Sequence, residues 1–139
     1  MSADLETLAR TVKAAQYRQH RAFDGALATI GTTLVQWDAL RAVSMSPGAS
    51  AHDLAVATFQ TDQAFGTLAN RLEAQGLIHR RPGVGRRIAH HLTPAGQRLL
   101  ADASLVVRRV REQLFAPLTE EECGDLQQLL SKLLAPGHA

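Results

Sequence analysis

Residues 61–93, TDQAFGTLANRLEAQGLIHRRPGVGRRIAHHLT, decide the fold that the sequence predicts. In the first half, apolar residues recur at the three- and four-residue steps of an α-helix, and Gly76 marks the end of that helix. A short apolar strand follows, then a turn that holds a proline and two glycines among four arginines, then a second strand. We therefore predict a helix over 61–75 and a β-hairpin over 77–92.

The chain before this stretch predicts three more helices. A long helix with a thin apolar stripe is expected over residues 3 to about 29, and a second helix over about 34–45. Ser50 is placed to cap a short third helix, and Thr61 to cap the helix of the quoted stretch. Two short helices joined by a tight turn, with a hairpin after the second helix, predict a winged helix-turn-helix.

Two further helices are predicted after the hairpin. Thr93-Pro94 favours a helix start, with threonine as the cap and proline at the first helical position. The last helix begins at a capping box, Thr119-Glu120-Glu121-Glu122, and carries a stripe of leucines. The outer helices, 1–30 and 94–135, hold more apolar surface than the small middle of the chain can cover. We expect them to form a dimer interface.

Length and composition predict one domain over residues 1–139 that is mainly α. The small β-hairpin over 77–92 forms the wing of that domain. Apolar residues make up 45% and aromatic residues 4%, so the core must rest on Leu, Val and Ala. The net charge is only +2, but no acidic residue lies between Glu73 and Asp102, a span with five arginines and three histidines. This local excess indicates a surface for a polyanion, and a solvated basic hairpin is the alternative.

Several classes of protein are disfavoured by what the sequence lacks. A single cysteine, Cys123, leaves no internal disulfide and no multi-cysteine zinc site. There is no Gly-rich phosphate loop and no metal-ligand spacing, so we expect neither an enzyme nor a cofactor. His79, His90 and His91 do not predict a metal site, because adjacent strand residues face opposite ways; phosphate or surface contacts are expected of them instead. Without a signal peptide or a long apolar run, we expect a cytoplasmic protein and no membrane partner.

In order and length, the whole chain resembles the multiple-antibiotic-resistance regulator (MarR) family of bacterial transcription factors. The resemblance is carried by QWDALRAV at 36–43, LANRLEAQGLIHRR at 68–81 and GRRIAHHLTPAGQRLL at 85–100. A helix ending in Leu-Glu-x-x-Gly-Leu-Ile, followed by a basic wing that closes on Leu-Thr-x-x-Gly, is specific in combination. The resemblance implies a homodimer that binds a pseudo-palindromic operator in double-stranded DNA. Release would follow binding of a small aromatic or phenolic effector, or, in some members, oxidation of a cysteine.

We therefore expect a sequence-specific transcriptional regulator that acts as a repressor, with residues 34–93 as its DNA-binding lobe. The alternative is a winged-helix module that binds protein partners without specific DNA. The arginine-rich wing, which contains no acidic residue, argues against that alternative.

Polar positions of the predicted recognition helix are the first candidate DNA contacts. Gln63 has the donor and acceptor that pair with adenine, and Thr67 can reach a base or touch a thymine methyl. Asp62 can accept from cytosine or only serve the helix start. Gly66 lets the backbone approach DNA closely or is simply tolerated. The predicted DNA-binding residues are Thr61, Asp62, Gln63, Gly66, Thr67, Asn70, Arg71, Arg80, Arg81, Arg86 and Arg87.

The resemblance also implies that one wing arginine enters the minor groove. Wings of the family usually carry Asp-x-Arg before the second strand, and counting back from Leu92-Thr93 places the arginine at Arg86 and Val84 at the aspartate position. Arg87 is the alternative if the register differs by one. The other wing arginines are expected to neutralise phosphates. Arg71, late in the helix, can reach a phosphate or pair with an acidic neighbour.

An effector pocket is implied between the dimer helices and the DNA-binding lobe. Tyr17, His20, Arg21 and Trp37 are the polar and aromatic groups available there, and each can equally pack without a ligand. Cys123 lies in the first turn of the last helix, where the helix N-terminus favours a reactive thiolate and the preceding glutamates disfavour it. A redox switch and a small packing residue are its two interpretations.

Overall fold

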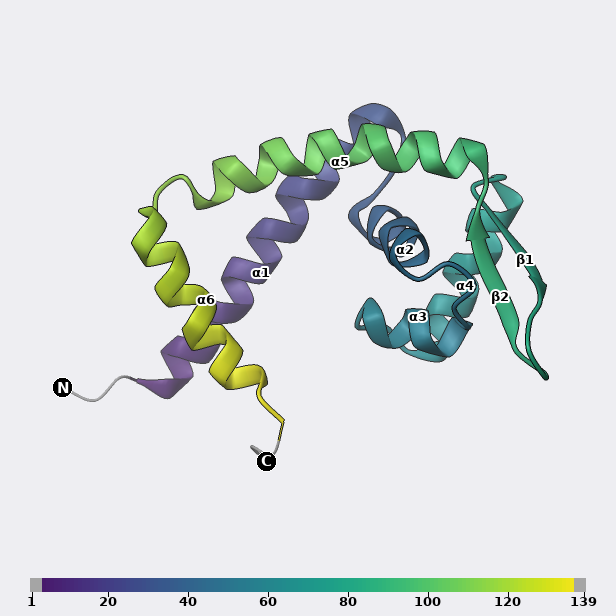
Figure 1. The fold of residues 1–139 in the computed structure, drawn as a ribbon. Coiled ribbons are helices and arrows are strands. Elements are labelled where there is room, and N and C mark those ends of the chain that lie inside the picture. The colour runs from purple at the N-terminus through teal and green to yellow at the C-terminus, as the bar shows by residue number, and fades with distance from the viewer. Residues whose placement is uncertain (1–3, 137–139) are drawn as a thin grey trace.

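The computed structural model describes residues 4–136, which form a helical chain with one small hairpin at its edge (Figure 1). The elements follow in the order α1 (Leu5–Leu27), the 3-10 helix η1 (Ala28–Ile30), α2 (Leu34–Met45), α3 (Ala51–Ala57), α4 (Asp62–Ala74), β1 (Ile78–Pro82), β2 (Ile88–Leu92), α5 (Pro94–Phe115) and α6 (Glu120–Leu134). The predicted mainly α fold with a winged helix-turn-helix is confirmed. Parts of the predicted domain 1–139, at residues 1–3 and 137–139, lie outside the described residues.

Side-chain caps begin most helices where the sequence predicted them. Ser50 accepts a hydrogen bond of 3.2 Å from the Asp53 amide, and Thr93 accepts one of 3.0 Å from the Gly96 amide. At α6 the predicted capping box is complete, because Thr119 and Glu122 bond reciprocally at 3.1 and 2.9 Å. Each cap satisfies an amide that would otherwise lack a partner, and contributes about 1 kcal/mol.

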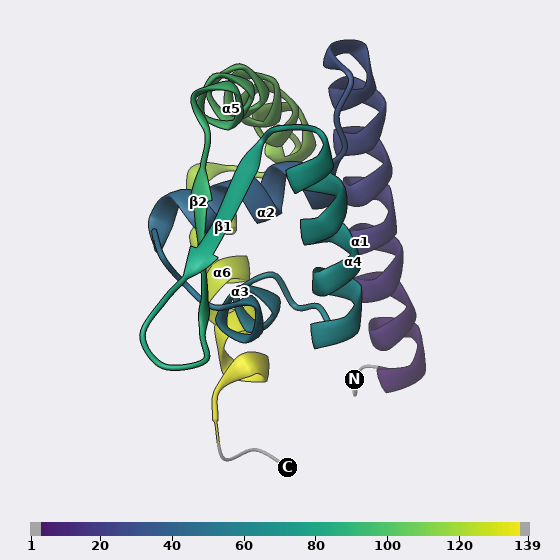
Figure 2. The same cartoon turned by 90° about the vertical axis from the view of Figure 1, so that its right-hand side faces the viewer.

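Two separate apolar cores hold the chain together. The first joins α2, α3, α4 and β1 in one lobe, around Leu40, Phe65 and Leu72. The second joins the end of α1 to the middle of α5, around Leu27 and Val107. Because α5 begins beside the hairpin and runs across to α1, it links the lobe to the outer helices (Figures 1 and 2).

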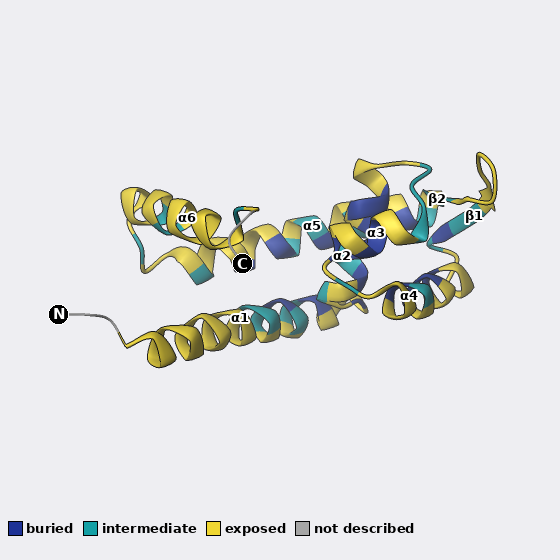
Figure 3. Ribbon diagram, turned by 90° about the horizontal axis from the view of Figure 1, so that it is seen from below, coloured by how far each residue is buried: buried dark blue, intermediate teal, exposed yellow. Residues whose placement is uncertain are grey.

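The outer helices leave much apolar surface uncovered within one chain. We expected the leucines of α6 to be buried, but α6 has no buried residue, and Leu134 is 81% exposed. The first half of α1 is likewise exposed, including Leu5, Leu8 and Val12 (Figure 3). Within residues 4–136 these side chains have too few neighbours to cover them, because neither core includes a residue of α6 or of the first half of α1. No helix of this part of the chain is both long and apolar enough to cross a membrane.

The first strand of the hairpin is longer than the sequence predicted. β1 continues through Pro82 and pairs with β2 in antiparallel register from Ile78↔Leu92 to Pro82↔Ile88, so two arginines placed in the turn lie in the strand. The turn itself is narrow. The Gly83 amide donates to the Arg87 carbonyl at 2.7 Å, and Gly85 takes a φ of +67°, which favours glycine.

Candidate nucleic-acid interface and the adjoining cavity

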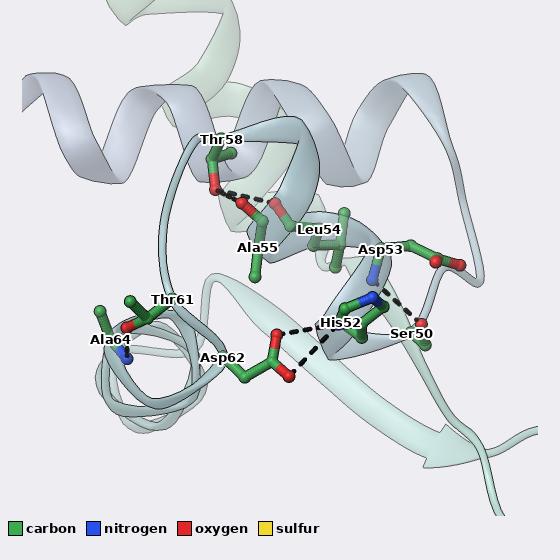
Figure 4. A network of polar contacts seen from close by, with 9 residues as sticks. All are labelled: Ser50, His52, Asp53, Leu54, Ala55, Thr58, Thr61, Asp62 and Ala64. Atoms are coloured by element: carbon green, nitrogen blue, oxygen red, sulfur yellow. Dashed lines mark hydrogen bonds and ion pairs between the residues drawn. The ribbon is translucent and has the colours of Figure 1, made fainter. Parts of the chain in front are cut away.

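The first turn of α4 presents a polar, exposed face beside α3. Thr61 caps the helix by accepting a hydrogen bond of 3.1 Å from the Ala64 amide (Figure 4). Gln63 is exposed and makes no side-chain hydrogen bond within residues 4–136. Thr67 donates its hydroxyl to the Gln63 carbonyl at 3.1 Å, which leaves its methyl group and an oxygen lone pair for an outside partner. Gly66 is half-buried, and a Cβ added there would meet nothing within 4 Å.

Asp62 is engaged in a contact that the sequence did not predict. Its carboxylate lies 2.9 Å from Nδ1 of His52, and both side chains are largely exposed (Figure 4). This pair joins the start of α4 to α3, the two helices of the helix-turn-helix. The geometry favours the interpretation in which Asp62 serves the helix start, because the carboxylate also lies in the first turn where the helix dipole favours negative charge.

Arg80 links the hairpin to the recognition helix. Its Nη2 donates to Oδ1 of Asn70 at 2.8 Å and to Oε1 of Glu73 at 2.7 Å. The hydrogen bond and charge of Arg80 hold the pKa of Glu73 below its ordinary value. Glu73 was missed as a site residue, although it is the last acidic residue before the acid-free span. The contact fixes β1 against α4, so the wing and the recognition helix hold a defined relative position.

The remaining arginines of the wing have no acidic partner among the described residues. Arg81, Arg86 and Arg87 are exposed, and no ion pair among residues 4–136 involves them or Arg71. Arg86 and Arg87 both lie in the turn beyond the strands, so either can reach furthest from the lobe. Such uncompensated guanidinium groups on a narrow hairpin suit a polyanion.

One prediction for the histidines is wrong. His90 is 1% exposed and belongs to the core, whereas a surface or phosphate contact was expected. Its Nδ1–H donates to the Ala49 carbonyl at 3.0 Å, and its ring meets Phe65 edge-on at 6.1 Å between centroids. Burial lowers the pKa of His90, and Nε2 has no partner among the described residues.

On the other face of the hairpin, His79 and His91 stack at 5.3 Å between ring centroids. His90 and His91 therefore face opposite ways, as the strand pattern predicted. Within residues 4–136, no three His, Cys, Asp or Glu side chains are grouped to hold a metal ion.

A cavity of about 410 Å³ opens between α1, α2 and the α3–α4 turn. Among the predicted effector residues, His20 lines this cavity. Trp37 does not line it, and its Nε1 instead donates a hydrogen bond of 3.1 Å to Oγ of Ser104, which attaches α2 to α5. Arg21 lies over the ring of Tyr17, 5.8 Å from its centroid, on the exposed side of α1. The lining is Gln16, His20, Leu34, Val35, Asp38, Thr58, Phe59 and Gln60. Most of these residues were missed, because they come from three segments that only the fold brings together.

Phe59 is the unusual residue of this cavity. It is 95% exposed and takes a φ of +57°, a left-handed conformation that is uncommon for a residue with a side chain. It lies in the turn between α3 and α4, two residues before the Thr61 cap. Cys123 lies elsewhere, half-buried beside Phe115 and Leu126 in a second, apolar cavity between α5 and α6.

Comparison with known proteins identifies the family. A model of the MarR family matches residues 30–88. The HTH-type transcriptional repressor Rv2887 of Mycobacterium tuberculosis is 36% identical over 110 residues, which cover 78% of this chain and 79% of that protein. The chain belongs to the MarR family. The homoprotocatechuate degradative operon repressor of Escherichia coli is 28% identical over 106 residues, which cover 75% of this chain and 72% of that protein.

Solved structures agree with this assignment. Rv2887 in complex with salicylic acid superposes with a TM-score of 0.72 at 31% identity, over 95% of this chain and 97% of that one. A mutant of MarR from E. coli complexed with operator DNA reaches a TM-score of 0.88 over 93% and 94% of the two chains. At 20% identity, that second likeness shows the fold alone.

Proposed function

We propose that this MarR-family protein is a homodimeric repressor that binds a pseudo-palindromic operator in double-stranded DNA and leaves it when a small aromatic or phenolic ligand binds. The observation that carries the proposal is the pairing of two surfaces at one end of the lobe. The exposed polar face of α4 and the free arginines of the wing are held together by the contact between Arg80 and Glu73. A polar helix face suits base edges in the major groove, and a narrow basic hairpin suits the adjacent minor groove.

The uncovered apolar faces of α1 and α6 support the dimer. Their leucines are exposed in one chain, and a soluble monomer rarely leaves so much apolar surface on two helices that lie at the same end (Figure 3). A second copy packed on these faces would give a two-fold axis. Two recognition helices related by that axis would enter successive major grooves about 34 Å apart, which is the reason for a pseudo-palindromic operator. Such a repressor would act in the cytoplasm, where bacterial operators lie.

The cavity supports release by a ligand. It touches α1 and α2 on one side and the turn before the Thr61 cap on the other, so it adjoins both the outer helices and the recognition helix. A ligand that prefers a dimer with another spacing of the recognition helices must weaken DNA binding, because the coupling between the two sites is reciprocal.

The test is fluorescence anisotropy against a pooled promoter library, repeated over a range of salt concentrations. We expect tight, sequence-selective binding that weakens steeply as salt rises. Arg86→Ala should lose about 1–3 kcal/mol of binding free energy and change the preferred sequence. The matched control is Arg108→Ala on α5, where the arginine is exposed and paired only with Glu112 one turn away.

Two outcomes would count against the proposal. Weak binding that ignores sequence would favour the alternative, a winged-helix module for protein partners. Unchanged affinity of Arg86→Ala at physiological salt would mean that Arg86 does not enter a groove, and Arg87→Ala would then test the other register.

A further inference from the structure

We propose that the cavity between α1, α2 and the α3–α4 turn takes an aromatic ligand whose polar end donates hydrogen bonds, an arylalkylamine above all, and that it rejects aromatic carboxylates. The inference deepens the proposed function and rests on it for the consequence of binding. It would separate this chain from the relative that was solved with salicylic acid, which is an aromatic carboxylate.

The charge of the lining is the first argument. Asp38 is half-buried beside the cavity, and its carboxylate has no hydrogen bond or ion pair within residues 4–136. No lysine or arginine belongs to the described lining. The cation nearest in sequence, Arg41, is exposed and lies over the Trp37 ring, 6.0 Å from its centroid. The charge of Arg41 partly offsets the effect of burial on the pKa of Asp38, but no ion pair joins the two side chains among residues 4–136. A ligand carboxylate would therefore meet the charge of Asp38 in a lining that, among the described residues, holds no lysine or arginine, which is unfavourable in a partly desolvated site.

The hydrogen bonds already made around the cavity give the second argument. Nε2 of His20 lies 3.1 Å from the Asp24 carboxylate, which also accepts the Leu34 amide at 2.8 Å. Asp24 therefore holds the His20 ring at the edge of the cavity through Nε2. Both carboxylate oxygens of Asp24 are thus engaged within the chain, and Asp38 is the one carboxylate of the described lining that is left to a ligand.

The turn residues show the same preference. Thr58 donates its hydroxyl to the Leu54 carbonyl at 2.7 Å and accepts from Nε2 of Gln60 at 3.1 Å. Gln60 thereby uses one of its donors and keeps its carbonyl oxygen free. The carboxylate of Asp38 and the side-chain carbonyls of Gln16 and Gln60 are the remaining acceptors, against the amide N–H groups of Gln16 and Gln60 as donors. A ligand that brings its own donors satisfies more of these groups than one that brings acceptors.

Size and apolar surface select the rest of the ligand. About 410 Å³ is within the range of small-molecule sites, and Leu34, Val35 and Phe59 supply an apolar wall for a ring. Burial raises the pKa of Asp38 because it disfavours the charged carboxylate, and Arg41 offsets this only in part. A ligand cation beside Asp38 would favour the charged form and pair with it. Phe59 also offers a ring face, which attracts an ammonium group.

The position of Phe59 connects binding to the recognition helix. It and Gln60 immediately precede Thr61, whose hydroxyl caps α4. A ligand that moves the left-handed Phe59 toward a more favourable φ would therefore shift the start of α4.

Isothermal titration calorimetry of the full chain without DNA tests the ligand class with three probes that share a phenyl ring: 2-phenylethylamine, 2-phenylethanol and phenylacetate. We expect the amine to bind tightest and phenylacetate to bind at least about tenfold more weakly than the amine. Asp38→Asn, which keeps the shape of the side chain, should weaken the amine about tenfold and leave the alcohol nearly unchanged. The matched control is Asp102→Asn, an exposed aspartate on α5 away from the cavity.

Phenylacetate binding as tight as the amine, an Asp38→Asn variant with unchanged amine affinity, or no binding of the amine would each overturn the inference. Val35→Phe, which fills the apolar wall from a partly exposed position, gives a second variant; it should abolish amine binding while thermal melting shows an intact fold. Anisotropy with operator DNA separates the two proposals. Operator binding without amine binding rejects the ligand class alone, whereas amine binding without operator binding rejects the repressor.

Discussion

Replacing Gly96 with alanine should destabilise the protein, although alanine is the better helix former. Gly96 lies in the first turn of α5, where an added Cβ would overlap the Leu77 carbonyl oxygen and lie 3.0 Å from the Leu77 carbonyl carbon. Both are backbone atoms, so the overlap can be relieved only if α5 moves away from the start of the hairpin. The same carbonyl oxygen accepts a hydrogen bond of 3.1 Å from the Thr93 amide, which this movement would lengthen.

Three contributions set the size of the effect. Forcing an extra carbon against backbone costs about 3 kcal/mol. Loss of the hydrogen bond from the Thr93 amide to the Leu77 carbonyl costs about 1 kcal/mol. The higher helix propensity of alanine stabilises the helix by about 1 kcal/mol in the opposite direction. We expect Gly96→Ala to lower the free energy of unfolding by about 3 kcal/mol. DNA affinity should fall as well, because α5 positions the hairpin that forms the wing.

Gly66→Ala is the matched control, since it makes the same change in another helix where an added Cβ meets nothing within 4 Å. It should raise the free energy of unfolding by about 1 kcal/mol. Urea unfolding would be measured at one protein concentration for all variants, because the stability of a dimer depends on concentration. A Gly96→Ala protein as stable as the wild type would refute the close approach of α5 to Leu77.

Two further predictions concern charge. Glu73→Gln should tighten DNA binding and steepen its salt dependence by about one unit, because the charge of Arg80 loses its acidic partner and becomes available to a phosphate. The hydrogen bond from Arg80 to Asn70 remains and keeps β1 against α4. Anisotropy over a salt series checks this, and an unchanged slope would place Arg80 away from the DNA. Burial lowers the pKa of His90 from its ordinary value of 6.5, so the unfolded chain takes up the proton first as the pH falls. The His90 contribution to stability should be complete above pH 6.5 and be lost as the pH falls toward the pKa of His90 in the folded protein. Urea unfolding midpoints measured between pH 7.5 and 5.5 should therefore decline more steeply for the wild type than for His90→Leu. Parallel declines would contradict the buried position of His90.

The sequence by itself determined the elements and their order. The Thr61, Thr93 and Thr119 caps act on amides three residues away, so their chemistry is visible in a short window of sequence. The apolar spacing of α4 likewise depends on helix geometry alone, and its predicted buried residues are buried. The acid-free basic span is also visible in the order of charges alone, and Arg81, Arg86 and Arg87 of that span are exposed on the hairpin.

The tertiary structure decided which partner each side chain meets. Strand alternation predicted that His90 and His91 face opposite ways, but only packing against Phe65 turned His90 inward. Arg80 was assigned to phosphate, yet the fold brings it to Glu73 on the preceding helix. The need for glycine at position 96 and the cavity beside Asp38 arise in the same way, because both depend on segments that are distant in sequence and close in space. Contacts of this kind depend on how elements pack, and no local pattern of residues encodes that packing.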